Sequence, residues 1–155
     1  MKKFNASDCG RYIRAHQNPL ILAGDGCDHI KLDDKMLSDY AADFAVKLNC
    51  QVAATGNTIN GMIKRQGVKV RKAWLVELIT SLKGEWVDPI LPERPDLLIF
   101  IGYRPEMIDG IIAGLDVIGT VHLGPGKSLT AEHSMEAGTF SEWKNNLDAL
   151  IGSIG

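Results

Sequence analysis

The sequence has few cysteines, and none of them are close together. Cys9, Cys27 and Cys50 are the only three in 155 residues, and no CxxC pair is present. Disulfide frameworks use an even number of cysteines, and structural zinc or iron–sulfur sites use closely spaced ones. We therefore expect buried free thiols and a reducing compartment, and no metal centre.

Segments that direct a chain into a membrane are also missing. The sequence becomes polar directly after Phe4, without the apolar core of a signal peptide. No run of residues approaches the roughly 18 apolar residues of a membrane helix. We expect a cytoplasmic protein that does not bind membranes.

A strong charge of either sign is absent as well. The net charge is −2 and the isoelectric point is about 6.1, so nucleic acid is not an expected partner. The hydrophobic fraction of 45% and the charged fraction of 23% are ordinary for a globular domain. A length of 155 residues is typical of one domain, so we expect a single domain over residues 1–155.

What the sequence does contain is an alternation of apolar runs and helical patterns. The clearest runs are Leu20–Ala23, which ends at two glycines, and Asp96–Gly102. Their uninterrupted apolar character is typical of strands that are covered on both faces. Shorter strands are expected at Gln51–Thr55 and Ile118–Leu123, with a last edge strand within 134–138.

Helical patterns lie between these strands. The first expected helix is capped by Ser7 or Asp8 and ends near Gln17, and the second, at Lys35–Leu48, is capped by Asp33 or Asp34. A third helix is expected at Trp74–Leu82 and a fourth from Pro105. The last expected helix is capped by Ser141. Gly24–Lys31 is expected to be a loop, and Thr58–Lys72 is the least regular segment.

This alternation predicts the α/β class. We expect a Rossmann-like three-layer domain with a parallel sheet of five or six strands, in the order 3-2-1-4-5-6, and helices on both faces. Ligands of such sheets bind where the strands end, so the turn Gly24-Asp25-Gly26 is the first candidate site. The turn resembles the start of a dinucleotide fingerprint without its third glycine, which leaves phosphate binding and a plain turn both open.

Other motifs predict little chemistry. The run Gly124-Pro125-Gly126-Lys127-Ser128 ends like a P-loop, but Val121 stands at the position of the required first glycine. The metal-ligand types in Cys27-Asp28-His29, His122 and His133 lack the spacing of a metal site. No nucleophile motif is present, so the sequence predicts no catalytic residue and no bound metal.

The stretch Lys64–Lys72 contains five basic residues and no acidic one. A solvated loop and a protein contact both remain open for it, because apolar residues such as Met62 and Ile63 lie beside the charges. These two residues, Trp74 and the fourth helix are candidate surfaces for a homo-oligomer.

The layout of these segments resembles a known family, the epsilon subunit of the archaeal acetyl-CoA decarbonylase/synthase (carbon monoxide dehydrogenase) complex. The resemblance covers about Gly10 to Ile151 and is carried by Arg14–Gly24, Cys50–Thr55, Pro95–Gly102 and Val121–Leu123. The layout is also similar to the central domain of thiamine-diphosphate enzymes and to Rossmann-like domains that bind FAD or NAD. The absence of further domains favours the epsilon subunit.

The resemblance implies a six-stranded parallel sheet and a role in one-carbon metabolism. It implies an α2ε2 assembly with the large nickel–iron–sulfur subunit, which holds the metal clusters, so the small subunit alone has no expected activity. A part in electron transfer makes FAD a candidate cofactor. Matching positions place any cofactor cleft at the strand-end turns Gly24, Asp25 and Gly26; Thr55, Gly56 and Asn57; Gly102, Tyr103 and Arg104; and Gly124 and Gly126.

The alternative is a free-standing nucleotide-binding module or a small enzyme. It would use FAD, NAD or ADP in the cleft next to Gly24–Gly26.

Overall fold

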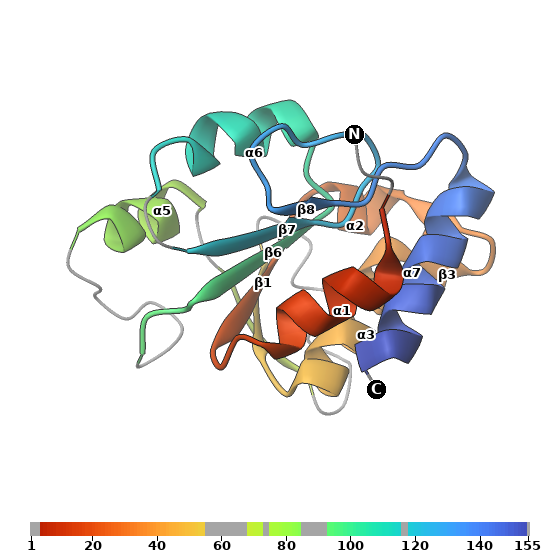
Figure 1. The fold of residues 1–155 in the computed structure, drawn as a ribbon, viewed down its shortest axis with the longest axis horizontal. Helices are drawn as coiled ribbons and strands as arrows, with labels where there is room; N and C mark the ends of the chain where they lie inside the picture. Colours follow the sequence, from red (N-terminus) through yellow and green to blue (C-terminus); the bar gives the residue numbers. More distant parts are fainter. Residues whose placement is uncertain (1–3, 55–67, 73–74, 85–92, 116–117, 155) are drawn as a thin grey trace.

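A parallel sheet of six strands lies between two layers of helices in the computed structural model (Figure 1). The structure describes residues 4–54, 68–72, 75–84, 93–115 and 118–154. The helices are α1 (Ala6–Arg14), α2 (Gly26–His29), α3 (Leu37–Leu48), α5 (Leu75–Lys83), α6 (Pro105–Ile112) and α7 (Phe140–Ile154). The strands are β1 (Pro19–Ala23), β2 (Lys31–Leu32), β3 (Lys35–Met36), β4 (Gln51–Ala54), β5 (Lys69–Lys72), β6 (Leu97–Ile101), β7 (Gly119–His122) and β8 (His133–Ser134). None of the helices within these ranges is long and apolar enough to cross a membrane.

The strand order confirms the predicted α/β topology. The main sheet has the order β5-β4-β1-β6-β7-β8, and all its neighbouring strands are parallel. Numbered along the chain within this sheet, that order is 3-2-1-4-5-6. Ile21 of β1 lies between Val52 of β4 and Ile99 of β6, so the order reverses next to β1. This reversal is the switch point at which doubly wound sheets bind ligands.

Helices bury both faces of the sheet. All residues of β6 are buried, as are the last four of β1, which explains their uninterrupted apolar sequences. Residues on one face of β1 and β6, such as Ile21 and Ile99, share a core with α1, α3 and α7. Leu20 and Phe100 on the other face share a core with α5 and α6. The same division of helices is visible in Figure 1.

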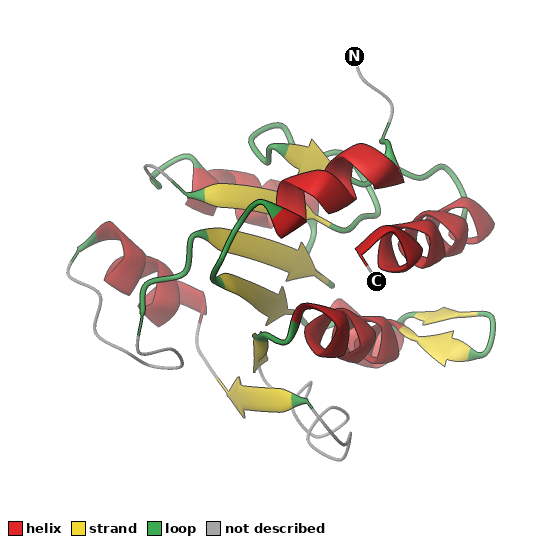
Figure 2. Cartoon of the chain, turned by 60° about the horizontal axis from the view of Figure 1, so that its bottom comes forward, coloured by secondary structure: helices red, strands yellow, loops and turns green. Residues whose placement is uncertain are grey.

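A small hairpin stands where the second helix was expected to begin. β2 and β3 pair antiparallel, and Asp33 occupies the turn with a φ of 56° (Figure 2). Aspartate tolerates this left-handed conformation, so the prediction that Asp33 or Asp34 caps a helix from Lys35 was wrong. The helix α3 begins at Leu37 and ends, as expected, at Leu48, and the residue that follows it, Asn49, has a φ of 50°.

Two other predicted helix caps were also wrong. At α1, the Asp8 N–H donates to Oδ1 of Asn5 at 2.9 Å, so Asn5 is the cap, and this helix ends at Arg14 rather than near Gln17. At α7, the Glu142 N–H donates to Oγ1 of Thr139 at 3.1 Å, two residues before the predicted cap Ser141. Several residues in each segment have side chains that can cap a helix, and the path of the incoming chain selects one of them.

Two segments are more regular than their sequences predicted. The expected loop Gly24–Lys31 contains the single turn of α2, and the end of the Thr58–Lys72 segment is the strand β5. A basic strand such as β5 is typical of the edge of a sheet. Residues 55–67 lie outside the described residues, as does Trp74, so the predicted contact surfaces at Met62, Ile63 and Trp74 are not described.

Three further strands and the start of the fourth helix agree with the predictions. The strands β4, β6 and β7 lie in the predicted segments, and Pro105 is the first residue of α6. An edge strand does follow β7, but β8 is at His133–Ser134 and shares only Ser134 with the predicted region 134–138.

Candidate functional site

A cleft of about 1130 Å³ lies at the carboxyl ends of β1, β6 and β7. Its walls are residues 25–26 and 29–30 after β1, residues 102–107 after β6, and residues 124–126 after β7. The cleft is therefore at the topological switch point, where the sequence predicted a ligand to bind.

The structure brings most of the predicted site residues together. Those that line the cleft are Asp25, Gly26, Gly102, Tyr103, Arg104, Gly124 and Gly126. Gly24 lies against one of them, because a Cβ atom at Gly24 would be 2.8 Å from the Tyr103 ring. Thr55, Gly56 and Asn57 lie outside the described residues.

Two glycines bring the turns after β1 and β6 into direct backbone contact. The Gly26 N–H donates to the Gly102 carbonyl oxygen at 3.0 Å. A Cβ atom at Gly26 would be 2.8 Å from the same oxygen, so a larger residue has no space there. Gly102 itself has a φ of 84°, which side chains other than glycine rarely tolerate. The two glycines therefore allow the turns after β1 and β6 to pack backbone against backbone at this wall of the cleft.

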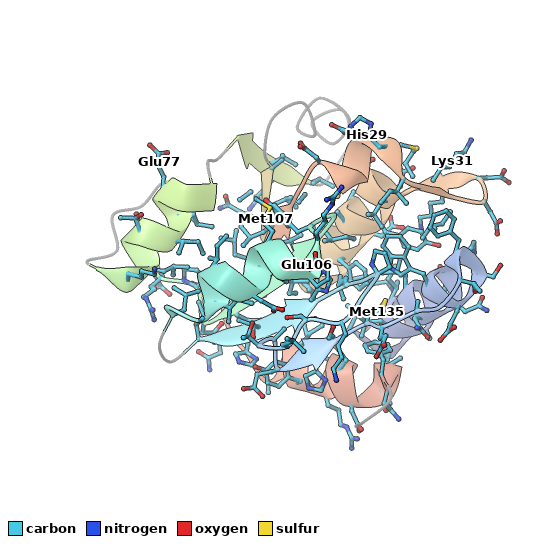
Figure 3. The ribbon with its side chains drawn as sticks, turned by 90° about the horizontal axis from the view of Figure 1, so that it is seen from above. His29, Lys31, Glu77, Glu106, Met107 and Met135 are labelled. Atoms are coloured by element: carbon cyan, nitrogen blue, oxygen red, sulfur yellow. The ribbon has the colours of Figure 1, made fainter. Side chains whose placement is uncertain are left out.

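Side chains of both charges and apolar groups surround this backbone. Asp25, His29, Arg104 and Glu106 line the cleft with their side chains exposed to solvent. Met107 adds an apolar side chain that is 54% exposed. In Figure 3, Glu106 and Met107 lie at the start of α6 and His29 lies on α2, the elements on the two sides of the cleft.

A buried histidine forms a hydrogen bond with the backbone of the turn after β6. His122 has no exposed surface, and its Nε2 lies 2.9 Å from the Tyr103 carbonyl oxygen. A carbonyl only accepts, so Nε2 carries the hydrogen and the neutral ring donates it. Burial lowers the pKa of His122 more than its hydrogen bond and the charges of Asp109 and Glu106 raise it. The sequence presented His122 only as a candidate metal ligand, whereas the structure makes it a neutral support of the cleft.

The cysteines do not contribute reactive groups to the cleft. Cys9 and Cys27 are buried, Cys50 is half-buried, and all three are free thiols. Burial raises the pKa of each thiol to about 12. Within the described part of the chain, no three histidine, cysteine, aspartate or glutamate side chains gather as a metal site would require.

Comparison with known proteins finds a relative of this sequence. No protein-family model matches the sequence. The chain is similar to the protein named acetyl-CoA decarbonylase/synthase complex subunit epsilon from Methanopyrus kandleri, with 26% identity over 123 residues. The aligned segment covers 76% of this chain and 69% of that protein. This relative therefore carries the name of the family that the strand and turn pattern resembles.

Proposed function

We propose that the chain is an accessory subunit of an acetyl-CoA decarbonylase/synthase complex. The observation that carries this proposal is the similarity to the Methanopyrus kandleri subunit, which extends over 123 residues. A segment of that length includes most elements of the sheet, so the similarity concerns a whole domain rather than one motif. We take residues 1–155 to form that one domain.

In this role the chain binds and stabilises the large metal-containing subunit of carbon monoxide dehydrogenase and contributes no catalytic residue. The three free thiols support a reducing compartment such as the cytoplasm.

In the absence of the large subunit, the chain associates with copies of itself. Sedimentation that detects only monomer at high protein concentration would contradict this self-association.

We further propose FAD as the cofactor of this subunit, bound in the cleft and with a part in electron transfer. The Arg104 guanidinium at the wall of the cleft can bind a pyrophosphate. Ile30, Pro105 and Met107 provide apolar surface for flat rings. Bound there, FAD would supply the redox chemistry, while these residues hold and orient it.

The subunit role is tested by purification from the native organism. A tagged copy of the chain should recover the large metal-containing subunit from cell extract, identified by mass spectrometry and by its nickel and iron. A strain that carries the tag alone is the control. Recovery of the tagged chain without any such subunit would overturn the proposal.

A free-standing nucleotide-binding module is the second candidate, and the size and glycine lining of the cleft favour it. FAD, NAD or ADP at about 100 times its dissociation constant should stabilise the chain by about 2.7 kcal/mol. Arg104→Gln should reduce this stabilisation, whereas Lys31→Gln, which changes an exposed lysine outside the cleft lining, should not. Unchanged thermal stability with all three nucleotides would exclude this candidate.

A further inference from the structure

The loop after β7 is bound to a single carboxylate on α6. Asp109 of this helix accepts hydrogen bonds from the Leu129 N–H at 3.0 Å and the Thr130 N–H at 3.3 Å. It also accepts from the Thr130 hydroxyl at 2.8 Å and from the Ser128 hydroxyl. Three consecutive loop residues thus direct their donors at one side chain, and Figure 1 shows the loop beside α6.

Further hydrogen bonds fold the loop around this contact. The Ser128 hydroxyl oxygen accepts from the Ala131 N–H at 3.1 Å, and the Ser128 N–H donates to Oγ of Ser134 at 2.9 Å. The Glu132 N–H donates to Oγ1 of Thr120 at 3.1 Å, which ties the end of the loop to β7. The beginning of the loop, residues 124–126, is a wall of the cleft.

The donors that bind Asp109 lie at the end of the run from Gly124 to Ser128 and directly after it. The run from Gly124 to Ser128 resembles the end of a P-loop, in which backbone N–H groups and the lysine face phosphates and the Ser or Thr hydroxyl binds Mg²⁺. Here the donors of Ser128 and the two following residues face Asp109 of the same chain. The anion that organises this loop is therefore internal.

Burial does little to hold the tip of the loop. Leu129 is 80% exposed, and Thr130 is exposed as well. Hydrogen bonds to an ionised acceptor are stronger than neutral ones. Partial burial raises the pKa of Asp109, but the hydrogen bonds from Leu129, Ser128 and Thr130 together lower it by more. The net effect is a pKa below the usual value, so the carboxylate is ionised at neutral pH.

We infer that Asp109 is a positioning residue, whose carboxylate latches the loop of residues 124–132 onto α6 and thereby sets the Gly124–Gly126 wall of the cleft. Only the use of that wall by a ligand rests on the proposed function. The latch itself is a property of the free chain, and it can be tested without a ligand.

Amide hydrogen exchange measured by NMR on the full chain tests the latch. In Asp109→Asn, the side-chain amide cannot accept the same set of hydrogen bonds. The Leu129 and Thr130 amides should then exchange at least about tenfold faster, because hydrogen bonds to a charged group contribute about 1.5–3 kcal/mol. The Gly124 and Gly126 resonances should shift. Glu77→Gln, which removes an exposed carboxylate on α5, should change neither property. Unchanged exchange and resonances in Asp109→Asn would overturn the inference.

A second variant separates the latch from general damage to the fold. Thr130→Val removes one donor to Asp109 and leaves α6 intact, so it should accelerate exchange at positions 129 and 130 several-fold while β1 and β6 amides keep their rates. If those two positions are unaffected, the latch is wrong. If nucleotides stabilise the wild type, equal stabilisation of Asp109→Asn would contradict the link to the cleft. If they stabilise neither protein, the proposed nucleotide function fails while the exchange data still decide the latch.

Discussion

The Gly26 N–H donates to the Gly102 carbonyl oxygen at 3.0 Å, and this hydrogen bond joins the turns that follow β1 and β6. The two strands are neighbours in the sheet although their turns are far apart in the sequence. The contact brings the first wall of the cleft next to the second at the switch point. It explains why both positions are glycines: Gly26 has no room for a side chain beside the Gly102 oxygen, and Gly102 has a positive φ.

Gly26→Ala should destabilise the chain by about 1–3 kcal/mol. The new Cβ atom would lie 2.8 Å from the Gly102 oxygen, and a backbone oxygen cannot rotate away as a side chain can. Denaturant unfolding measures the loss. Gly110→Ala is the matched control: no atom lies within 4 Å of its added Cβ, and its position in α6 should gain about 0.5–1 kcal/mol. Equal stability of the two variants would contradict the described contact.

His122 should make the chain less stable in weak acid. Because its pKa in the folded chain is below the usual value of 6.5, the unfolded state binds the proton first. The contribution of His122 to stability is therefore complete above about pH 6.5 and is lost as the pH falls toward its folded pKa. Urea unfolding at a series of pH values should show this loss in the wild type. The loss should be smaller in His122→Gln and unchanged in His29→Gln, which alters an exposed histidine. The same pH dependence in all three proteins would contradict the prediction.

The cap of α7 can be distinguished from the residue that the sequence suggested. Thr139→Ala removes the hydroxyl that accepts the Glu142 N–H and should destabilise the chain by about 1 kcal/mol. Ser141→Ala should change stability by less than about 0.5 kcal/mol, because that residue is exposed within the first turn of the helix. Thermal unfolding of both variants measures the difference. A larger effect of Ser141→Ala would restore the sequence-based prediction.

The three thiols should react slowly while the chain is folded. With pKa values of about 12, on the order of one thiol in ten thousand is ionised at pH 8. The unfolded chain should react with a disulfide reagent on the order of a thousandfold faster, since free cysteine has a pKa of about 8.5. Absorbance of the released reagent anion in buffer and in urea measures both rates. In the folded chain, the half-buried Cys50 should react before Cys9 and Cys27. Immediate reaction of all three thiols without urea would show that they are not buried.

Much of the cleft could be predicted because its turns follow strands that are visible in the sequence. The glycines after β1, β6 and β7 stop apolar runs, and parallel strands bring their carboxyl ends to one edge. The supporting side chains could not be predicted in this way. His122 and Asp109 act on residues that are 19 to 21 positions away in the sequence, across different elements. No local pattern marks such pairs.

The sequence by itself determined the α/β class, the parallel sheet and its strand order. These follow from uninterrupted apolar strands that alternate with helical periodicity, and periodicity is a local property of the chain. Only the tertiary structure decided which of several polar residues cap a helix, that Asp33 turns a hairpin, and that Asp109 holds the loop after β7. Each of these choices depends on the path that packing gives the backbone, because that path decides which donors and acceptors come within hydrogen-bonding distance.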